Sequence, residues 1–436
     1  MRTRLPNRRT RAAAWRLAGL GAGWLASLAV AQTAPPRPPQ PAQPAPAPVA
    51  TARAPATPLG APPGQAAPGA PASPSIGPLQ GLDPASLAAF ASGREEFTSV
   101  ETVAGGLGPI FNDVSCVACH HAGGAGGASA RTVTRFGRTV DGRFDPMVEL
   151  GGPLLQERAI NPQCREHVPA SATVVARRLT TPLYGAGLIE AIADEAIVLQ
   201  AQRPKPDGVK GRAALVTDPT TGLQRVGRFG WKAQHATLLA FSADAYANEM
   251  GVTNRLFPQV ILPNGRSELL ARLPQTAGVE DRIDAASGKS GIDRSADFMR
   301  LLAPLPAARA TAQSIAGARV FEQAGCAACH QPVMYTGPHP VAALSNRPVA
   351  LYSDLLLHDM GRLGDGIEQP PAGAREMRTA PLWGLRARPA YLHDGRARTV
   401  TQAIEAHDGE AAASRERFKA LKVEQQRQLL DFLNTI

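Results

Sequence analysis

The sequence predicts a mainly α-helical protein made of two similar halves, with long loops and one small β-hairpin. Each half has a short helix of the form G-x-x-x-F, at Gly93–Phe97 and at Gly317–Phe321. In each half a C-x-x-C-H motif follows this helix, and an aromatic-basic element that leads into an apolar helix comes later. Because the same features recur in the same order, we infer a degenerate internal duplication.

The two C-x-x-C-H motifs carry the chemistry. Two thiols spaced in this way, with a histidine directly after the second, are what covalent attachment of c-type haem requires, and the histidine then binds the iron. A zinc site or a thioredoxin-like redox pair are the alternatives, but neither needs that histidine. We therefore predict two class c cytochrome-like haem domains. Their cofactor-binding residues are Cys116, Cys119 and His120 for haem 1, and Cys326, Cys329 and His330 for haem 2.

The composition of the chain divides it into four segments. Residues 1–31 have an arginine-rich start and an apolar run that ends in Ala29-Val30-Ala31, which is typical of a cleaved signal peptide. Residues 32–78 are rich in Pro and Ala and read as a disordered linker. We expect an N-terminal haem domain over 79–305 and a C-terminal one over 306–436. Export to the periplasm or medium agrees with haem attachment, which occurs outside the cytoplasm.

The net charge does not indicate a nucleic-acid partner. The formal charge is +10, but six arginines lie in residues 1–31, and the rest of the chain carries +4. The propionates of two haems would bring it close to neutral. The linker allows association with a membrane or cell wall. Cys164 is the one cysteine outside the two motifs, and we expect a buried thiol there.

The periodic patterns predict these further elements. Helices are expected from Asp83-Pro84, from near Ile189, over 232–250, over Ser295–Leu302, over Ser314–Phe321 and over Arg415–Leu433. A hairpin is expected from Ala213–Val216 and Leu223–Val226, which flank a turn-forming Asp-Pro-Thr-Thr-Gly sequence.

Many stretches resemble one family, the bacterial di-haem c-type oxidoreductases, which are peroxidase-like and thiol-oxidoreductase-like cytochromes. They are relatives of the di-haem cytochrome c peroxidases and of the di-haem enzyme that matures methylamine dehydrogenase. The stretches are GLGPIFNDVSCVACH (106–120), TTPLYGAGLIEAI (180–192), RFGWKA (228–233), NEMGVTN (248–254), GCAACHQP (325–332), YSDLLLHDMG (352–361), RTAPLWGLR (378–386) and YLHDGRARTVTQAIEAHDGEA (391–411). The resemblance implies a two-domain peroxidase-like fold and leaves the substrate and a bound calcium ion open.

The sixth iron position decides between catalysis and electron transfer, because a protein ligand there closes the iron and an open position admits peroxide. For haem 2 we expect Met360 as the metal ligand, with Met377, His358 and His393 as alternatives. For haem 1 the candidates are His121, His167 or no ligand, and we expect an open site.

The resemblance also suggests catalytic and electron-transfer residues. Glu249 is similar in position to the proton-transferring glutamate of the peroxidases, and the nearest upstream glutamine, Gln234, is expected to lie too far back along a helix. Trp231 and Trp383 are candidates for carrying electrons between the two haems. Asp394, Arg396 and His407 are expected to be partners of propionates or of the domain interface.

These observations favour an exported di-haem enzyme that reduces hydrogen peroxide or a related oxidant at haem 1 with electrons passed through haem 2. A small donor protein, such as a cytochrome c or a cupredoxin, is the expected partner. The alternatives are a pure electron-transfer cytochrome and a high-valent di-haem oxidase of a protein or organic substrate.

Overall fold

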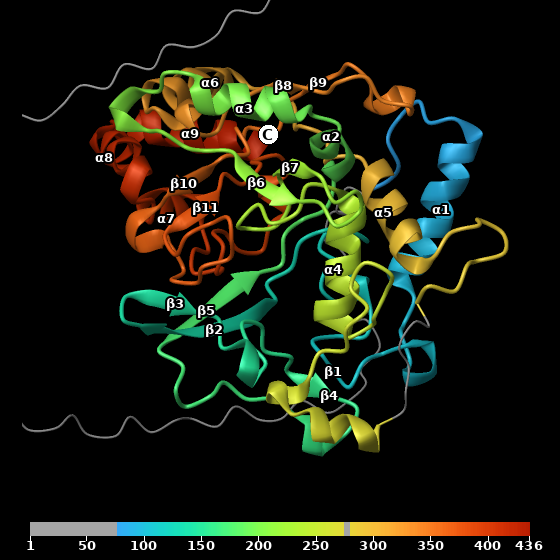
Figure 1. Ribbon diagram of the computed structural model, residues 1–436. Coiled ribbons are helices and arrows are strands. Elements are labelled where there is room, and N and C mark those ends of the chain that lie inside the picture. Colours follow the sequence, from blue (N-terminus) through green and yellow to red (C-terminus); the bar gives the residue numbers. More distant parts are fainter. Residues whose placement is uncertain (1–75, 274–279) are drawn as a thin grey trace, which may run out of the picture. The chain divides into compact units, whose positions relative to one another are not determined.

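The computed structural model describes residues 76–273 and 280–436, which all belong to one unit, Gly69–Ile436 (Figure 1). The predicted signal peptide and most of the predicted linker lie outside the described residues. The α-helices are α1 Pro84–Thr98, α2 Ala186–Glu190, α3 Asp194–Gln202, α4 Leu238–Met250, α5 Gly291–Leu301, α6 Ala312–Gln323, α7 Val400–Glu405, α8 Ala412–Ala420 and α9 Val423–Thr435. None of the helices in these two ranges is long and apolar enough to cross a lipid bilayer.

The strands are short and form small antiparallel sheets. Their bounds are β1 Ile110–Phe111, β2 Thr132–Val140, β3 Arg143–Asp145, β4 Arg158–Ala159, β5 Val174–Leu179, β6 Ala214–Thr217, β7 Gln224–Gly227, β8 Met334–Tyr335, β9 Pro348–Val349, β10 Leu357–Asp359 and β11 Glu376–Arg378. The largest sheet has the order β3-β2-β5, and the other pairs are β1-β4, β6-β7, β8-β9 and β10-β11. Helical residues outnumber strand residues in the described ranges, so the mainly α class is confirmed at that level.

The first G-x-x-x-F helix, α1, packs on α5. Asp83 caps its start by accepting a hydrogen bond from the amide of Ser86 at 2.8 Å, and Pro84 occupies the first turn. A Cβ atom on Gly93 would lie 2.3 Å from a backbone oxygen of α5, so only glycine permits this close approach. Phe97 then packs on Phe298 of α5, with ring centroids 4.7 Å apart.

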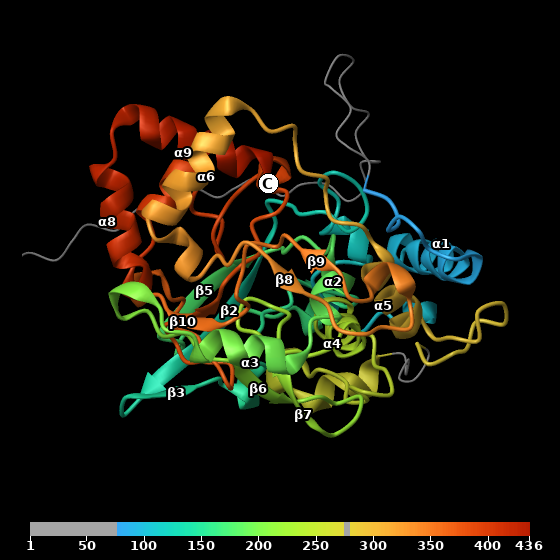
Figure 2. The ribbon, with the colours of Figure 1, turned by 90° about the horizontal axis from the view of Figure 1, so that it is seen from above.

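The second G-x-x-x-F helix, α6, packs on α9 in the same way. A Cβ atom on Gly317 would lie 1.9 Å from the backbone oxygen of Gln428. Phe321 meets Phe432 of α9 edge to face, with ring centroids 5.4 Å apart. Figures 1 and 2 show the two helix pairs in separate parts of the fold, α1 beside α5 and α6 beside α9. The repeated residues therefore do the same thing in both halves. The glycine lets two helices approach closely, and the phenylalanine packs on an aromatic ring of the neighbouring helix.

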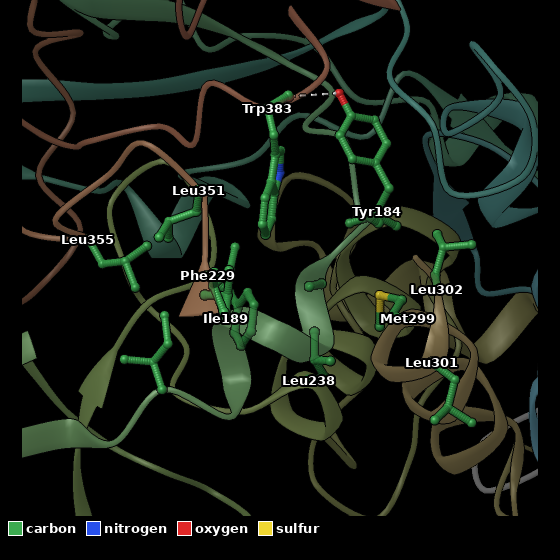
Figure 3. Close-up of a cluster of buried hydrophobic side chains, with 14 of the residues drawn as sticks. Tyr184, Ile189, Phe229, Leu238, Met299, Leu301, Leu302, Leu351, Leu355 and Trp383 are labelled. Atoms are coloured by element: carbon green, nitrogen blue, oxygen red, sulfur yellow. Dashed lines mark hydrogen bonds between the residues drawn. The ribbon is translucent and has the colours of Figure 1, made fainter. Parts of the chain in front are cut away.

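A cluster of buried apolar side chains joins the two halves (Figure 3). Tyr184, Ile189, Phe229, Met299, Leu351 and Trp383 are among its members. Burial of a side chain of this size contributes about 1.5–3 kcal/mol. The Tyr184 hydroxyl also donates a weak hydrogen bond to the backbone oxygen of Trp383 at 3.4 Å.

Several predicted elements are confirmed and others are corrected. The hairpin is present as β6-β7, and α1 and α6 begin close to their predicted starts. The predicted helix over 232–250 begins only at Leu238, where Thr237 caps α4, and α5 begins four residues earlier than expected. The predicted helix over Arg415–Leu433 is two helices, because the chain is extended at Leu421 and Lys422. The helix expected from near Ile189 is two helices, α2, which contains Ile189, and α3, and the β3-β2-β5 sheet was not predicted.

Candidate functional site

The two C-x-x-C-H motifs fold in the same local conformation. Each forms a single 3₁₀ turn, at Cys116–Ala118 and at Cys326–Ala328. The amide of the histidine closes the turn by donating to the oxygen of the first cysteine, at 3.0 Å for His120 and 2.9 Å for His330. The turn thus brings both thiols and the imidazole of one motif close together.

Each motif lines its own cavity. Cavity 1, of about 170 Å³, contains Cys116, Cys119 and His120 in its wall. Cavity 2, of about 190 Å³, contains Cys326, Cys329 and His330. Protein interiors are close-packed, so a space of this size beside each motif is room for a bound group. Burial raises the pKa of Cys116 and of Cys326 to about 12, so both are neutral thiols near pH 7.

Cavity 1 contains the predicted catalytic carboxyl group. Glu249, near the end of α4, lines it, and Asn112 Nδ2 donates to Glu249 Oε2 at 2.8 Å. Burial raises the pKa of Glu249 above its ordinary value, although the bond from Asn112 opposes this. Gln234 lines the same cavity, so the expectation that it lies too far away is wrong. The physical reason is that Gln234 lies in the turn before α4, which folds back toward the cavity.

Two guanidinium groups in cavity 1 have donors without partners. Arg135 Nε and Arg178 Nη2 are buried, line this cavity and make no hydrogen bond within the described residues. Buried donors of this kind match an acceptor that enters the cavity, such as a carboxylate. Sequence reasoning missed both arginines, because nothing in their local sequence separates them from the many other arginines of the chain.

The predicted histidines of haem 1 are not in cavity 1. His121 and His167 are exposed and do not line it. His120 itself lies close to Phe97, with ring centroids 6.1 Å apart, and no second imidazole faces it in the part of the chain that the structure describes. Burial lowers the pKa of His120 to about 4, so its imidazole is neutral near pH 7. An open position at haem 1 stays a prediction, and Met250 and Met299 also line cavity 1.

The candidates for haem 2 lie together in cavity 2 but differ in their contacts. Met360 and Met377 both line the cavity. Both ring nitrogens of His358 face carboxylates, Asp354 at 3.0 Å and Glu410 at 2.8 Å. Burial opposes a charge on His358, but these bonds raise its pKa to about 11. Both ring nitrogens of His358 are therefore engaged by carboxylates rather than directed at His330.

His407 is a member of cavity 2 that sequence reasoning assigned otherwise. It was expected to meet a propionate or the domain interface, and the structure places its ring next to that of His330, with centroids 6.4 Å apart. A single histidine 77 positions after the motif has no spacing signal, so only the fold brings it there. Asp394 and Arg396, predicted for the same roles, pair with each other at 2.5 Å.

Trp231 forms part of both cavity walls. It is the residue after Gly230 in RFGWKA, and its indole Nε1 donates to the oxygen of Leu179 at 2.8 Å. Arg378, from the second half, donates its amide to the oxygen of Trp231 at 2.9 Å. Trp383, the other predicted aromatic, lines neither haem cavity and lies in a smaller third cavity with Trp231.

A buried ion network fixes this wall. Asp365 from the second half bonds Arg178 at 2.8 Å and Lys232 at 3.0 Å, and all three side chains are almost completely buried. Arg178 lines cavity 1, and Lys232 follows Trp231 in the chain. The network therefore ties the loop after β10 to the wall between the cavities.

The comparisons with known proteins agree with this arrangement. Residues 155–436 match the family described as "Di-haem oxidoreductase, putative peroxidase". The chain belongs to the di-haem oxidoreductase family. Among curated proteins no match is found.

Solved structures similar to this di-haem oxidoreductase include hydrazine synthase from Kuenenia stuttgartiensis, at 14% identity over 83% of this chain and 90% of that one, with a TM-score of 0.39. The diheme peroxidase BthA from Burkholderia thailandensis is 14% identical over 81% of this chain and 86% of its own, with a TM-score of 0.35. A MauG-like protein associated with microbial copper homeostasis is 16% identical over 58% of this chain and 88% of its own, with a TM-score of 0.31.

Membership of the family implies haem cofactors, and the residues present fit them. Each cavity has two thiols and a buried imidazole on one turn. His330 Nδ1 donates to the oxygen of Tyr352 at 3.0 Å, which leaves Nε2 as the free lone pair. Unpartnered arginine donors face both cavities, since Arg388 Nε in cavity 2 also lacks a partner among the described residues. Cys164 is buried beside Ile110 and Leu269, as expected for a structural thiol.

Proposed function

We propose that this di-haem oxidoreductase is an exported enzyme that reduces hydrogen peroxide or a related oxidant in cavity 1, with electrons that enter through cavity 2. The observation that carries the proposal is the difference between the two cavities. In cavity 1 a carboxyl group, Glu249, lines the space, whereas in cavity 2 a second imidazole, that of His407, lies beside His330. An open site and a closed site are what catalysis and electron transfer respectively require.

Cys116, Cys119 and His120 would hold haem 1, and Cys326, Cys329 and His330 would hold haem 2 through thioether bonds and an axial imidazole. The bound iron of cavity 1 would supply the electrons that cleave the O–O bond. The overall reaction consumes one peroxide, two electrons and two protons and yields two waters, with the electrons supplied by a donor protein.

Glu249 would move the proton that this cleavage needs. Asn112 holds Oε2, and Oε1 makes no hydrogen bond within the described ranges, so it is the atom that would face peroxide. As a carboxylate it would take a proton from the near oxygen, and as a carboxylic acid it would return the proton to the far oxygen, which leaves as water. Such transfer contributes roughly 10²–10⁴-fold in rate. The Gln234 side-chain amide would orient the peroxide in the same cavity.

The wall between the cavities supports electron transfer through Trp231. It is the aromatic side chain common to both, and its indole and backbone are bonded from both halves. The division into domains at 305 is supported by the same lining residues. Cavity 1 draws only on residues before 305, whereas cavity 2 draws on residues after 320 with only Val209 and Trp231 from the first half.

The proposal also includes export of the protein, a tethering role for the linker of residues 32–78, and a small donor protein. They rest on the composition of residues 1–78 and on the site of c-type haem attachment. A cytochrome c or a cupredoxin would deliver electrons to haem 2.

The test is a titration of the purified holoprotein, followed by optical and EPR spectroscopy. The protein is reduced by one electron and then given one equivalent of peroxide. A high-spin signal that peroxide consumes rapidly, and that donor protein restores, supports the proposal. If both irons stay low-spin and peroxide only bleaches them, the protein is an electron carrier. If oxidising equivalents persist until an organic or protein substrate is added, the protein is an oxidase.

A further inference from the structure

The rings of His330 and His407 both line cavity 2, with centroids 6.4 Å apart and ring planes inclined by 60°. An imidazole nitrogen lies roughly 1.2 Å from its ring centroid and binds a first-row metal at about 2.0–2.1 Å. Two imidazoles on opposite sides of one metal ion therefore have centroids about 6.4 Å apart. The observed centroid separation of 6.4 Å therefore has room for one iron between the two rings.

The hydrogen bonds of the two rings leave the free lone pair of each ring on Nε2, the nitrogen that a metal would use. A carbonyl oxygen can only accept, so a ring nitrogen bonded to one must carry the proton. His330 Nδ1 donates to Tyr352 at 3.0 Å, and His407 Nδ1 donates to Ala403 at 2.7 Å. In each neutral ring Nε2 is then the acceptor, and no protein hydrogen bond to either Nε2 is present among the described residues. This is the arrangement of a metal-bound histidine oriented by a backbone carbonyl.

The fold holds His407 in this place. Thr399 and Gln402 form a reciprocal cap at the start of α7, and His407 lies just after the end of that helix. Its ring is oriented by Ala403, one turn earlier in α7. Its backbone oxygen accepts from Arg415 Nη1 of α8 at 2.6 Å. A ring anchored on both sides loses little further freedom when it binds iron.

The other histidines in the cavity lack this geometry. Both nitrogens of His358 are bonded to carboxylates. The ring of His393 meets Trp231 edge to face rather than His330. Met360 and Met377 also line the cavity, and their ligation is tested directly by the variants below.

We propose that His407, rather than Met360, is the sixth ligand of the haem held by Cys326, Cys329 and His330, so that this iron has two axial histidines. The inference rests on the proposed covalent haem of cavity 2 and deepens its electron-transfer role. Methionine ligation raises the reduction potential of a c-type haem, so two histidines give haem 2 a lower potential. A donor of correspondingly low potential is then required.

The test uses full-length holoprotein and its spectra rather than its activity. His407→Gly should convert haem 2 from low spin to high spin in EPR, and added imidazole should restore the low-spin signal. His407→Met should keep the iron low-spin, create the near-infrared charge-transfer band of methionine-ligated ferric haem and raise the potential. Met360→Leu and Met377→Leu, the matched controls, should leave spectrum and potential unchanged. Mass measurement confirms two haems per chain in each variant.

The outcomes separate this inference from the proposed function. A methionine charge-transfer band in the unaltered protein that disappears in Met360→Leu overturns the inference, as does a His407→Gly spectrum identical to the original. If the His407 results are as expected but peroxide does not react with the protein, the ligand assignment stands and the peroxidase proposal fails. If the chain binds no covalent haem, both fail.

Discussion

The indole of Trp231 and the imidazole of His393 meet edge to face, with ring centroids 6.3 Å apart, at the wall between the two cavities. The main chain reinforces this contact, because Leu179 accepts from Trp231 Nε1 and donates its amide to the oxygen of His393 at 2.5 Å. Trp231 lines both cavities and His393 lines the second. The aromatic path proposed between the haems is therefore built from both halves of the chain.

Trp231→Phe should slow electron transfer between the two haems several-fold, and Trp231→Leu should slow it further, since the aromatic ring is then lost. Stopped-flow spectroscopy of the reduced protein mixed with peroxide measures this as the oxidation rate of haem 2. Trp383→Phe is the control, because Trp383 lines neither haem cavity. Equal rates in the Trp231 and Trp383 variants would exclude this path.

Glu249→Gln should lower the rate of the peroxide reaction by roughly 10²–10⁴-fold. Because burial raises the pKa of Glu249, the carboxylate that accepts the proton forms at higher pH than for an exposed glutamate. The rate should therefore rise with pH, with a midpoint above the ordinary glutamate range, and this limb of the pH profile should be absent in the variant. Glu195→Gln, on an exposed part of α3, should change neither rate nor profile. A variant that keeps the limb would remove Glu249 from the mechanism.

Asp365→Asn should destabilise the protein by about 3–5 kcal/mol, because it leaves Arg178 and Lys232 as buried charges without their common partner. Urea unfolding of the holoprotein measures this as a lower midpoint. Arg427→Gln breaks an exposed pair with Glu424 at 3.4 Å and should cost less than about 1 kcal/mol. Similar midpoints for the two variants would show that the buried network does not stabilise the wall.

Glu280→Gln should stabilise the protein at pH 8 but not at pH 5. Burial raises the pKa of Glu280 to about 8, and its Oε2 has no hydrogen-bond partner in the described ranges. Between the unfolded pKa and this value the folded state binds more protons than the unfolded state, so stability falls as pH rises. The loss for the unaltered protein is on the order of a few kcal/mol. Glu95→Gln, at an exposed position, should leave the pH dependence unchanged; a flat profile in the unaltered protein would contradict the assignment.

The local patterns of the sequence were enough to predict much of the fold. The G-x-x-x-F helices are present, and their glycines and phenylalanines pack in the same way against α5 and α9. The hairpin β6-β7 follows from its turn residues. The single C-terminal helix was wrong, because an amphipathic pattern can continue across a break in the backbone. The β3-β2-β5 sheet was missed, since its strands are partly exposed and lack clear alternation.

The sequence by itself determined where haem can be attached, because a C-x-x-C-H turn places its two thiols and its imidazole within five consecutive residues. It also indicated the family, through short stretches that keep their local order. Only the tertiary structure decided what faces each motif. Gln234 and Glu249 both line cavity 1, and His407 lies beside His330 in cavity 2 although 77 positions separate them in sequence. The reason is that a ligand or proton carrier is selected by distance and direction in space, which residue spacing encodes only within one turn or helix.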